Sequence, residues 1–507
     1  MADNKLVDLE VLAGITEAAR RAGRKVVHCH GVFDLLHIGH IRYFQQARRM
    51  GDMLVVTLTP DRFVDKGPNR PAFVEALRAE AIASLDVVDH VAINRWPTAE
   101  ETLRLLRPHV YVKGSEFKAI QSDMTGKIGR EAEVVREIGA ELAFTEDVVF
   151  SSTQLINTYM SSLPHEIREY LDLFKHRHPL DEVLAVVDRF KDLRVLVVGD
   201  TIIDEYVYCD AIGKSSKDPM LAVKYQSEDR FAGGVLAVAN IVANFAGQVT
   251  LLSALGDAND PSAFVRSKLN PGIRAVFHAV PGRPTVTKRR LVEGYSLNKL
   301  IEIYVMDDRE LPEAVESALV VDLERAMKDV DLVVVSDFGH GMVTDRLVEV
   351  LSKSAPFLAV NTQANAGNRG FNTITRYPKV DYACIAEHEM RLEARRAQGE
   401  LRPMAEAARQ KLNARAMVVT RGQRGCVVST QAGDYVEVPA FAGKVVDRVG
   451  SGDAFLSVTS LAAVQGVPCE LLAFLGNVVG AHAVAQVGNE KAIDALQLKK
   501  TVTSLIK

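Results

Sequence analysis

Two short runs rich in β-branched residues, each leading through a glycine into a helical pattern, constrain the fold of this chain most. The first is KVVHCHGV at residues 25–32, and the second, LRVLVVGD, comes much later at residues 193–200. Runs of this kind are typical of strands that are buried on both faces of a parallel α/β sheet. A chain of 507 residues has room for roughly two to four domains. We therefore predict an α/β fold in two blocks, each opening on one of these strands.

A polar, charged segment separates the two blocks. It reads YMSSLPHEIREYLDLFKHRHPLDEVLAVVDRF at residues 159–190, with Pro164 and Pro179 as breaks in its helical pattern. The predicted organisation is therefore an N-terminal domain at 1–160, a helical connector at 161–190 and a C-terminal domain at 191–507.

Short apolar runs predict further strands, with helices between most of them. In the first block we expect strands at 53–59, 90–93, 110–114 and 141–146, and helices at 72–85 and 98–106. In the second block we expect strands near 193–199, 218–225, 249–254, 331–336, 357–361, 381–385, 416–420, 426–429 and 435–438, and helices from 452 onward.

Charge, cysteine content and the N-terminal residues exclude several classes of protein. The formal net charge is −4, which argues against the broad basic surface typical of nucleic-acid binding. The five cysteines are scattered and form no C-x-x-C pair, as expected for reduced thiols in a cytoplasm. The start, MADNKLVDLEVLAG, does not resemble a secretory signal, and no apolar run reaches the ~18 residues that span a bilayer. We expect a cytoplasmic protein with small-molecule substrates and no nucleic-acid or membrane partner.

The first candidate site is the segment HGVFDLLHIGH at residues 30–40. Gly31 lets the chain turn after the strand, and His37 and His40 open the following helix one turn apart, with Gly39 between them. A helix N-terminus offers free N–H groups and a positive dipole end, which favour bound phosphate. The pattern therefore predicts stabilisation of charge during nucleotidyl transfer. A zinc site that includes His28 and His30 is the weaker reading, because no carboxylate or second cysteine lies at ligand spacing.

This segment resembles the signature of the cytidylyltransferase-like nucleotidyltransferases, and the resemblance covers about residues 10–157. It implies a Rossmann-like domain in which Lys66 of KGPNRP reaches the triphosphate and Arg78 lies in the family's helix LRAEAIASLDVVDHV. It implies nucleotide binding at Gly31, Phe33, Gly39, Lys113, Gly114, Ser152 and Thr153. The segments VKG and TED…SST are more similar to sugar-1-phosphate adenylyltransferases than to glycerol-phosphate or choline-phosphate cytidylyltransferases.

The second candidate site is DRVGSGDAF at residues 447–455. Gly450, Ser451 and Gly452 precede an apolar helix and predict a nest of backbone N–H groups able to hold a phosphoryl group. Asp453 falls in the first helical turn, where it could accept a proton from an attacking hydroxyl.

This string resembles the signature of the ribokinase/PfkB sugar kinases, and the resemblance covers about residues 190–500. It implies a ribokinase-like α/β/α domain that uses Mg²⁺ and ATP. Implied sugar-binding residues are Asp204, Gly233, Gly234, Lys288 and Arg290; implied ATP-binding residues are Thr420, Gly422, Gly425, Gly450, Ser451, Gly452 and Asn477. Glu389 is retained from a motif that places the metal indirectly. Four segments depart from the family pattern: Ala237, the NTQ string at 361–363, Ala386, and Glu302 where heptose kinases tend to carry Arg.

Together the two blocks resemble bifunctional heptose-7-phosphate kinase/heptose-1-phosphate adenylyltransferases of lipopolysaccharide synthesis, with the domain order swapped. The resemblance implies an enzyme that phosphorylates a sugar or sugar phosphate and transfers AMP, or less readily CMP, to a sugar 1-phosphate. It also implies self-association into a homo-oligomer. The alternative is a nucleotidyltransferase that uses CTP and a polyol or amino-alcohol phosphate, with a kinase-like domain that is regulatory or weakly active.

Overall fold

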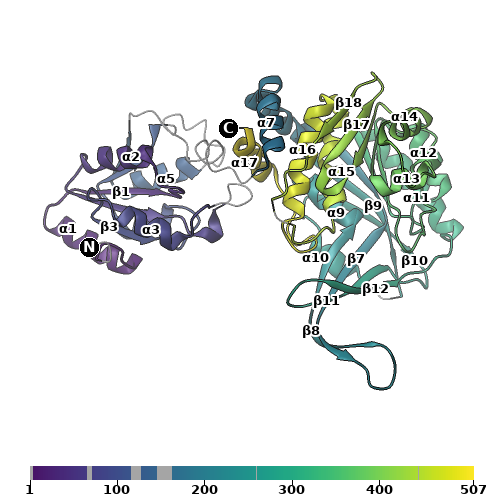
Figure 1. Ribbon diagram of the computed structural model, residues 1–507, viewed down its shortest axis with the longest axis horizontal. Coiled ribbons are helices and arrows are strands. Elements are labelled where there is room, and N and C mark those ends of the chain that lie inside the picture. The colour runs from purple at the N-terminus through teal and green to yellow at the C-terminus, as the bar shows by residue number, and fades with distance from the viewer. Residues whose placement is uncertain are drawn as a thin grey trace. The chain divides into compact units, whose positions relative to one another are not determined.

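The chain folds into two compact units. The computed structural model describes residues 4–64, 71–115, 127–145, 163–258, 260–443 and 445–506. The first unit comprises Met1–Pro164 together with Thr503–Lys507, and the second comprises His165–Val502 (Figure 1). Each unit has its own sheet and its own buried core, so each is considered by itself below.

The first unit is built on a parallel sheet of five strands in the order β3-β2-β1-β4-β5. The strands are β1 (Val26–Gly31), β2 (Met53–Leu58), β3 (His90–Ile93), β4 (Val110–Lys113) and β5 (Glu141–Phe144). The helices are α1 (Leu9–Arg21), α2 (Ile38–Arg48), α3 (Glu75–Ala83), α4 (Glu100–Leu106) and α5 (Lys127–Glu137). The chain reverses its direction across the sheet between β1 and β4, and ligands of such sheets bind at the carboxyl ends of the strands at this point.

The larger sheet of the second unit has nine strands in the order β10-β9-β6-β13-β14-β15-β16-β17-β18. Its strands are β6 (Arg194–Gly199), β9 (Gln248–Gly256), β10 (Ile273–Val280), β13 (Leu332–Asp337), β14 (Leu358–Thr362), β15 (Tyr382–Ala386), β16 (Ala416–Thr420), β17 (Cys426–Thr430) and β18 (Tyr435–Val438). The first seven in this order pair in parallel, and β17 and β18 are antiparallel. Strand β13 is buried throughout and β6 is buried after its first residue, as their continuous apolar runs predict.

Helices cover both faces of this sheet (Figure 1). The helices that follow β8 along the chain are α9 (Val235–Ala243), α10 (Ser262–Lys268), α11 (Glu313–Ala326), α12 (Asp345–Ser354), α13 (Glu387–Glu393), α14 (Leu401–Lys411), α15 (Ser451–Val464), α16 (Cys469–Ala483) and α17 (Ala495–Ile506). Helices α9, α15 and α16 are buried along most of their length, which is why their sequences are apolar all round. The α/β/α architecture expected from the sequence is therefore present in the second unit.

A smaller sheet of four strands, β12-β11-β7-β8, belongs to the same unit. Its strands are β7 (Thr201–Lys214), β8 (Leu221–Gly234), β11 (Val286–Glu293) and β12 (Lys299–Val305). The far end of the β7–β8 hairpin extends away from the body of the unit (Figure 1) and is exposed. Of these four strands, only part of β8 coincides with a strand expected from the sequence.

The segment between the two sheets forms helices α7 (His165–Arg177) and α8 (Leu180–Arg189). Phe174 stacks on Phe474 of α16 with ring centroids 4.2 Å apart. Arg177 and His178 both contact the carboxylate of Glu470, at the start of α16. These two helices are therefore packed into the second unit.

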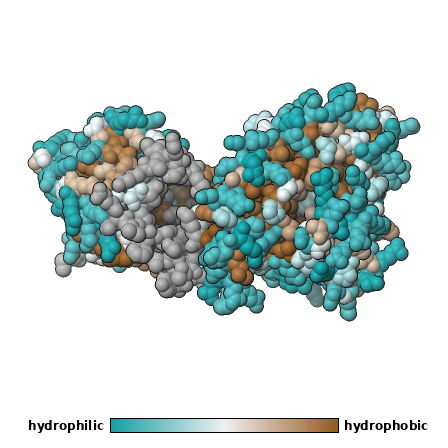
Figure 2. Space-filling model, turned by 90° about the horizontal axis from the view of Figure 1, so that it is seen from above, coloured by the Kyte–Doolittle hydropathy of each residue, from teal (hydrophilic) through white to brown (hydrophobic). Residues whose placement is uncertain are grey.

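Most of the surface on the face shown in Figure 2 is hydrophilic, with hydrophobic residues gathered in separate patches. Among the helices in the described ranges, none is both long and apolar enough to cross a membrane.

Candidate active sites

The first site lies where β1 ends and α2 begins. The side chain of His37 caps this helix, because its Nδ1 accepts a hydrogen bond from Gly39 N at 3.0 Å. Since Nδ1 is the acceptor, the proton of the neutral ring sits on Nε2, which can donate to a bound anion. The rings of His37 and His40 lie side by side with centroids 4.0 Å apart. The sequence-predicted histidine pair is therefore brought together at a helix N-terminus.

The turn before α2 holds an aromatic ring against a glycine. A Cβ on Gly31 would lie 3.0 Å from the tip of the Phe33 ring, which meets His40 edge-on at 5.5 Å between centroids. Phe33 and Leu35 both have positive φ values, 47° and 51°. Non-glycine residues rarely adopt this conformation, and strained residues of this kind cluster at binding sites.

Lys113 ends β4 at the same edge of the sheet, and Gly114 follows it. Its ammonium contacts the buried carboxylate of Glu131 at 2.8 Å and lies 5.0 Å from the ring centroid of Tyr111. Nucleotide binding by Lys113 stays a prediction, since Glu131 already compensates its charge. Lys66, Ser152 and Thr153 lie outside the described residues.

Two buried charged residues support the first site in ways that the motifs alone did not predict. The guanidinium of Arg78 donates to the carbonyl oxygens of Val32, Thr59 and Phe73 and pairs with Asp61. It therefore ties α3 to the ends of β1 and β2. Asp34 accepts hydrogen bonds from the backbone N–H groups of residues 72 and 73. The sequence marked Arg78 as part of a family helix but gave no signal for these contacts.

The second site is centred on the start of α15. Gly450 is the N-cap residue and has a φ of 81°, a conformation that favours glycine. A Cβ at this position would come within 1.9 Å of Oδ1 of Asn489, so any other residue would have to displace that side chain. Ser451 and Gly452 begin the helix, and Asp453 lies in its first turn. The free N–H groups of this turn and the helix dipole favour a bound phosphoryl group.

The carboxyl of Asp453 has an unusual pKa for an aspartate, which bears on its predicted role as a base. Burial, together with the nearby carboxylates of Asp204 and Glu389, raises the pKa of its carboxyl to about 7, against the opposing effect of Lys288. A general base works best with a pKa near the working pH.

The small sheet brings the expected sugar-binding residues to one face. Asp204 on β7 is the cross-strand partner of Lys288 on β11, and Arg290 pairs with Asp204 through its guanidinium. Gly233, at the end of β8, lies against Asp204, and Gly234 has a φ of 56° and begins the turn into α9. The structure therefore brings together residues that distant motifs separately predicted to bind the sugar.

Residues expected to bind ATP gather beside β16, β17 and β18. Thr420 ends β16, and Gly422 and Gly425, both with positive φ, frame the turn into β17. A Cβ on Gly425 would lie 2.0 Å from the carbonyl oxygen of Val438, and Asn477 Nδ2 donates to this same oxygen at 3.1 Å. The glycine motif and the helix residue therefore meet at one point of the sheet.

Glu389 is an almost fully buried carboxylate at the start of α13. It accepts hydrogen bonds from Ala386 N at 2.6 Å and from Ala364 N at 2.9 Å, which joins the loops after β14 and β15. Among the described residues, no cluster of three or more His, Cys, Asp or Glu side chains could hold a metal ion. Mg²⁺ is usually held by one or two carboxylates together with substrate phosphates, and an oxygen donor such as Glu389 fits that chemistry.

Asp447 links the small sheet to the loop that carries Gly450, a role the sequence did not reveal. It accepts hydrogen bonds from Tyr206 on β7 at 2.6 Å and from the backbone of Val449 and Gly488, both at 3.1 Å, and pairs with Lys299 on β12. This aspartate is therefore a structural contact between the small sheet and the loop that carries Gly450.

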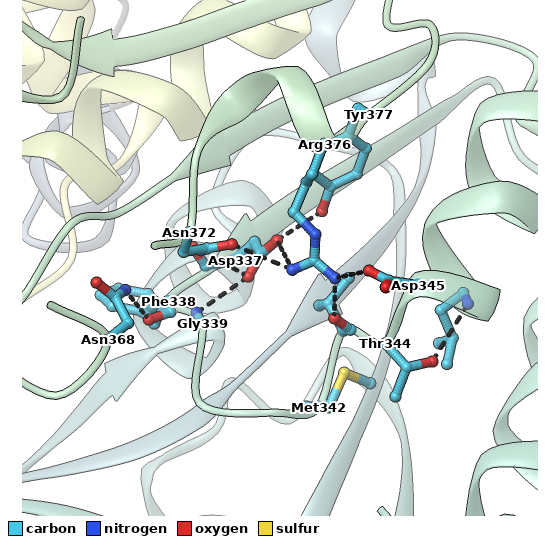
Figure 3. Close-up of polar contacts among 12 residues, drawn as sticks. Asp337, Phe338, Gly339, Met342, Thr344, Asp345, Asn368, Asn372, Arg376 and Tyr377 are labelled. Carbon is cyan, nitrogen blue, oxygen red and sulfur yellow. Dashed lines mark hydrogen bonds and ion pairs between the residues drawn. The ribbon is translucent and has the colours of Figure 1, made fainter. Parts of the chain in front are cut away.

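Asp337, at the end of β13, anchors a second buried network (Figure 3). Its carboxylate accepts hydrogen bonds from Tyr377, Asn372 and Gly339 N at 2.8 to 3.0 Å and pairs with Arg376 at 3.3 Å. Burial raises its pKa to about 6. The neighbouring Asp200 binds the backbone N–H groups of Phe338 and Met342. Together the two aspartates fix the loop that places Phe338 beside Lys288.

Comparisons with protein families agree with the two-unit division. Residues 192–495, more than half of the chain, match the model described as pfkB family carbohydrate kinase. Residues 28–158 match the model described as cytidylyltransferase-like.

Curated relatives match a shorter part of the chain. The bifunctional protein HldE of Geobacter sulfurreducens is 39% identical over 153 residues, which is 30% of each chain. HldE of Gluconobacter oxydans is 38% identical over 161 residues, 31% of this chain and 32% of that protein. This chain therefore matches about a third of the length of these relatives.

Among solved structures, phosphofructokinase-2 from Escherichia coli in complex with potassium aligns with a TM-score of 0.51 and 16% identity. The alignment covers 62% of this chain and 100% of that one. The complex of the same enzyme with fructose-6-phosphate aligns over the same shares with a TM-score of 0.50. At this identity the similarity concerns the fold.

Proposed function

Because the chain belongs to the pfkB family of carbohydrate kinases and carries a cytidylyltransferase-like unit, we propose that it is a bifunctional enzyme of sugar-nucleotide synthesis. The second unit phosphorylates a sugar with ATP, and the first transfers a nucleotidyl group to a sugar 1-phosphate. One observation carries the proposal: Asp453 lies in the first turn of α15, behind the glycine turn, and its buried carboxyl has a pKa near neutrality that Asp204 helps to raise.

In the kinase step, hydroxyls of the sugar bind Asp204, and the reacting hydroxyl points to Asp453. The oxygen of this sugar hydroxyl attacks the γ-phosphorus of ATP, and the bond from that phosphorus to the ADP oxygen breaks. The proton of the hydroxyl passes to Asp453. The N–H groups of the turn from Gly450 to Gly452 stabilise the charge on the transferring phosphoryl group. Thr420, Gly422, Gly425 and Asn477 bind the nucleotide.

In the transferase step, a phosphate oxygen of the sugar 1-phosphate attacks the α-phosphorus of the nucleoside triphosphate and pyrophosphate leaves. No general base is needed, because the attacking oxygen is already anionic. His37, through Nε2, and His40 donate to the phosphoryl oxygens as charge develops, with Lys66 as a further cation. The nucleotide is ATP by resemblance, and CTP is the alternative.

Both steps use nucleoside triphosphates, whose Mg²⁺ complex neutralises phosphate charge when bound. In the second unit, Glu389 is the carboxylate we expect near this ion. A cytoplasmic location fits the supply of ATP and the free cysteines of the described residues.

The proposal is tested by incubating the full chain with ATP or CTP, Mg²⁺ and single sugars or sugar phosphates. Mass spectrometry then identifies the phosphorylated sugar and the nucleotide sugar. We expect ADP formation that depends on a sugar and pyrophosphate release that depends on a sugar 1-phosphate. No ADP formation with any sugar would leave the kinase-like unit a regulatory module.

A further inference from the structure

The face of the small sheet that carries the residues expected to bind the sugar is charged. Its cross-strand partners on this face are Asp204 with Lys288 and Arg290 with Glu302. The register also places Tyr304 beside Lys288 on the same face, and the Lys288 ammonium lies 5.3 Å from the centroid of that ring. These strands therefore form one wall of the acceptor site.

The positive charge of Arg290 is already paired on this wall. One guanidinium nitrogen pairs with Asp204 and the other with Oε1 of Glu302, at 2.7 Å. Both partners hold it in place, and the Arg290 side chain is largely buried. Two carboxylates for one guanidinium leave this end of the wall negative rather than positive.

Lys288 is the second cation, and it is also surrounded by acidic groups. It is 4% exposed and lies between the rings of Tyr304 and Phe338, at 5.3 and 5.0 Å. The carboxylates of Asp204, Glu302 and Asp200 act on it electrostatically.

The neighbouring groups add no net positive charge, because the further cation Lys299 on β12 is paired with Asp447. The ring of His340 stacks near Phe338, and burial together with Lys288 lowers its pKa to about 4, so it is neutral at pH 7. Asp453 adds a further carboxyl. Apart from the Lys299–Asp447 pair, the cations here are Lys288 and Arg290, and four carboxyl groups act on one or both of them electrostatically: Asp200, Asp204, Glu302 and Asp453.

We propose that the kinase acceptor is an uncharged sugar, and that Glu302 is the specificity-determining residue that disfavours phosphorylated sugars. This inference rests on the proposed kinase function and names its substrate class. A phosphate group would bring about −1.5 to −2 charges to a wall that is already negative, and such like-charge contacts are strongly unfavourable. A sugar hydroxyl instead donates to Asp204 or Glu302 at no cost in charge.

A consequence concerns the order of the two reactions. If the attacking group is the anomeric hydroxyl, an uncharged sugar becomes a sugar 1-phosphate in one step. This product is the acceptor class of the first unit, so the two reactions can follow each other without an intervening dephosphorylation.

The test compares sugars with their phosphates. Free hexoses and heptoses, each paired with the corresponding terminal phosphate ester, are assayed for ADP formation by the full chain and by Glu302→Gln and Glu302→Arg. The exposed Glu228 on β8, beside Arg230, provides the control Glu228→Gln. Thermal unfolding, the KM for ATP and nucleotidyl transfer report whether each variant is folded.

We expect the unmodified chain to prefer free sugars by about tenfold or more in kcat/KM. Glu302→Gln should reduce this preference, Glu302→Arg should shift it toward the phosphates by at least about tenfold, and Glu228→Gln should not change it. A preference of the unmodified chain for the phosphates, or an unchanged ratio in both Glu302 variants, would overturn the inference. If no free or phosphorylated sugar supports ADP formation, the kinase function itself is wrong.

Discussion

Gly233 lies so close to Asp204 that a Cβ at position 233 would come within 2.0 Å of Oδ2 of this aspartate. The glycine therefore sets the position of the carboxylate that we expect to bind sugar hydroxyls. In Gly233→Ala, the added methyl group displaces Asp204 and with it Arg290. A displacement of about 1 Å can lower a rate about 100-fold. We expect a loss of this size in kcat/KM for the sugar, measured as ADP formation.

The matched control is Gly272→Ala, because a Cβ there meets only the side chain of Asn270, at 3.4 Å, an ordinary contact. It should keep full kinase activity. In Gly233→Ala, pyrophosphate release by the first unit should also be unchanged. Equal kinase activity in the two alanine variants would show that Gly233 does not position Asp204.

The kinase should lose activity as the pH falls through about 7. Burial, helped by Asp204 and Glu389, raises the pKa of Asp453 to about 7, so the carboxyl is protonated below that pH and cannot accept a proton. We predict that kcat/KM for the sugar rises with pH up to about 7 and then levels off. The measurement is a pH profile of ADP formation at saturating ATP. A profile that is flat from pH 5 to 8 would contradict the role of Asp453.

Asp453→Asn keeps the shape of the side chain but removes the base. General base catalysis is worth about 10²- to 10⁴-fold, and we expect the kinase rate to fall by this factor. The remaining activity should lose its dependence on pH near 7. Pyrophosphate release by the same protein serves as the control, and a normal kinase rate in the variant would rule out Asp453 as the base.

His40→Ala should lower nucleotidyl transfer. A donor that stabilises developing charge is worth about 10²- to 10³-fold in rate, and the loss should appear in kcat for pyrophosphate release. ADP formation by the second unit should be unchanged, and thermal unfolding reports whether the first unit of the variant is folded. The exposed His388, on α13 of the second unit, gives the control His388→Ala, which should leave pyrophosphate release intact. Full pyrophosphate release in His40→Ala would exclude the histidine pair from the reaction.

The two helix starts at which we expect nucleotide phosphates to bind could be predicted from the sequence because they rest on local patterns. A strand, a glycine turn and a helix follow one another within a few residues at His37, and a glycine turn leads directly into a helix at Asp453. Local hydrophobic periodicity and helix-start chemistry are sufficient to recognise them. The buried strands β1, β6 and β13 were predicted for the same reason.

The acceptor wall was not predictable in this way. On β11 the inward positions carry Lys288 and Arg290, so the pattern of polar and apolar residues does not reveal a strand with a buried face. Their partners lie far away in sequence: Asp204 is 86 residues from Arg290. Lys299 is 148 residues from Asp447. Contacts of this range become visible only once the sheet has formed, and no periodic pattern marks them.

The last prediction concerns stability and compares two aspartates that bind the same arginine. Arg376 pairs with Asp337, which is buried, and with Asp345, whose side chain is 93% exposed. Asp337→Ala leaves Arg376 without its buried partner and also removes the acceptor of Tyr377 and Asn372. Removing one member of a buried pair costs about 3–5 kcal/mol, whereas an exposed pair contributes about 0–1 kcal/mol. Asp345→Ala is therefore the matched control, and urea unfolding of the two variants should separate them by at least about 2 kcal/mol.

The dependence of this difference on pH gives a second check, because burial raises the pKa of Asp337 to about 6. A folded-state pKa above that of the unfolded chain means that ionisation of this carboxyl costs stability as pH rises from about 4 to 6. The loss of unfolding free energy caused by Asp337→Ala should therefore become smaller as pH rises across this range. The loss caused by Asp345→Ala should change less. Equal free energies of unfolding for the two variants at pH 7 would show that the network in Figure 3 does not stabilise the loop beside Lys288.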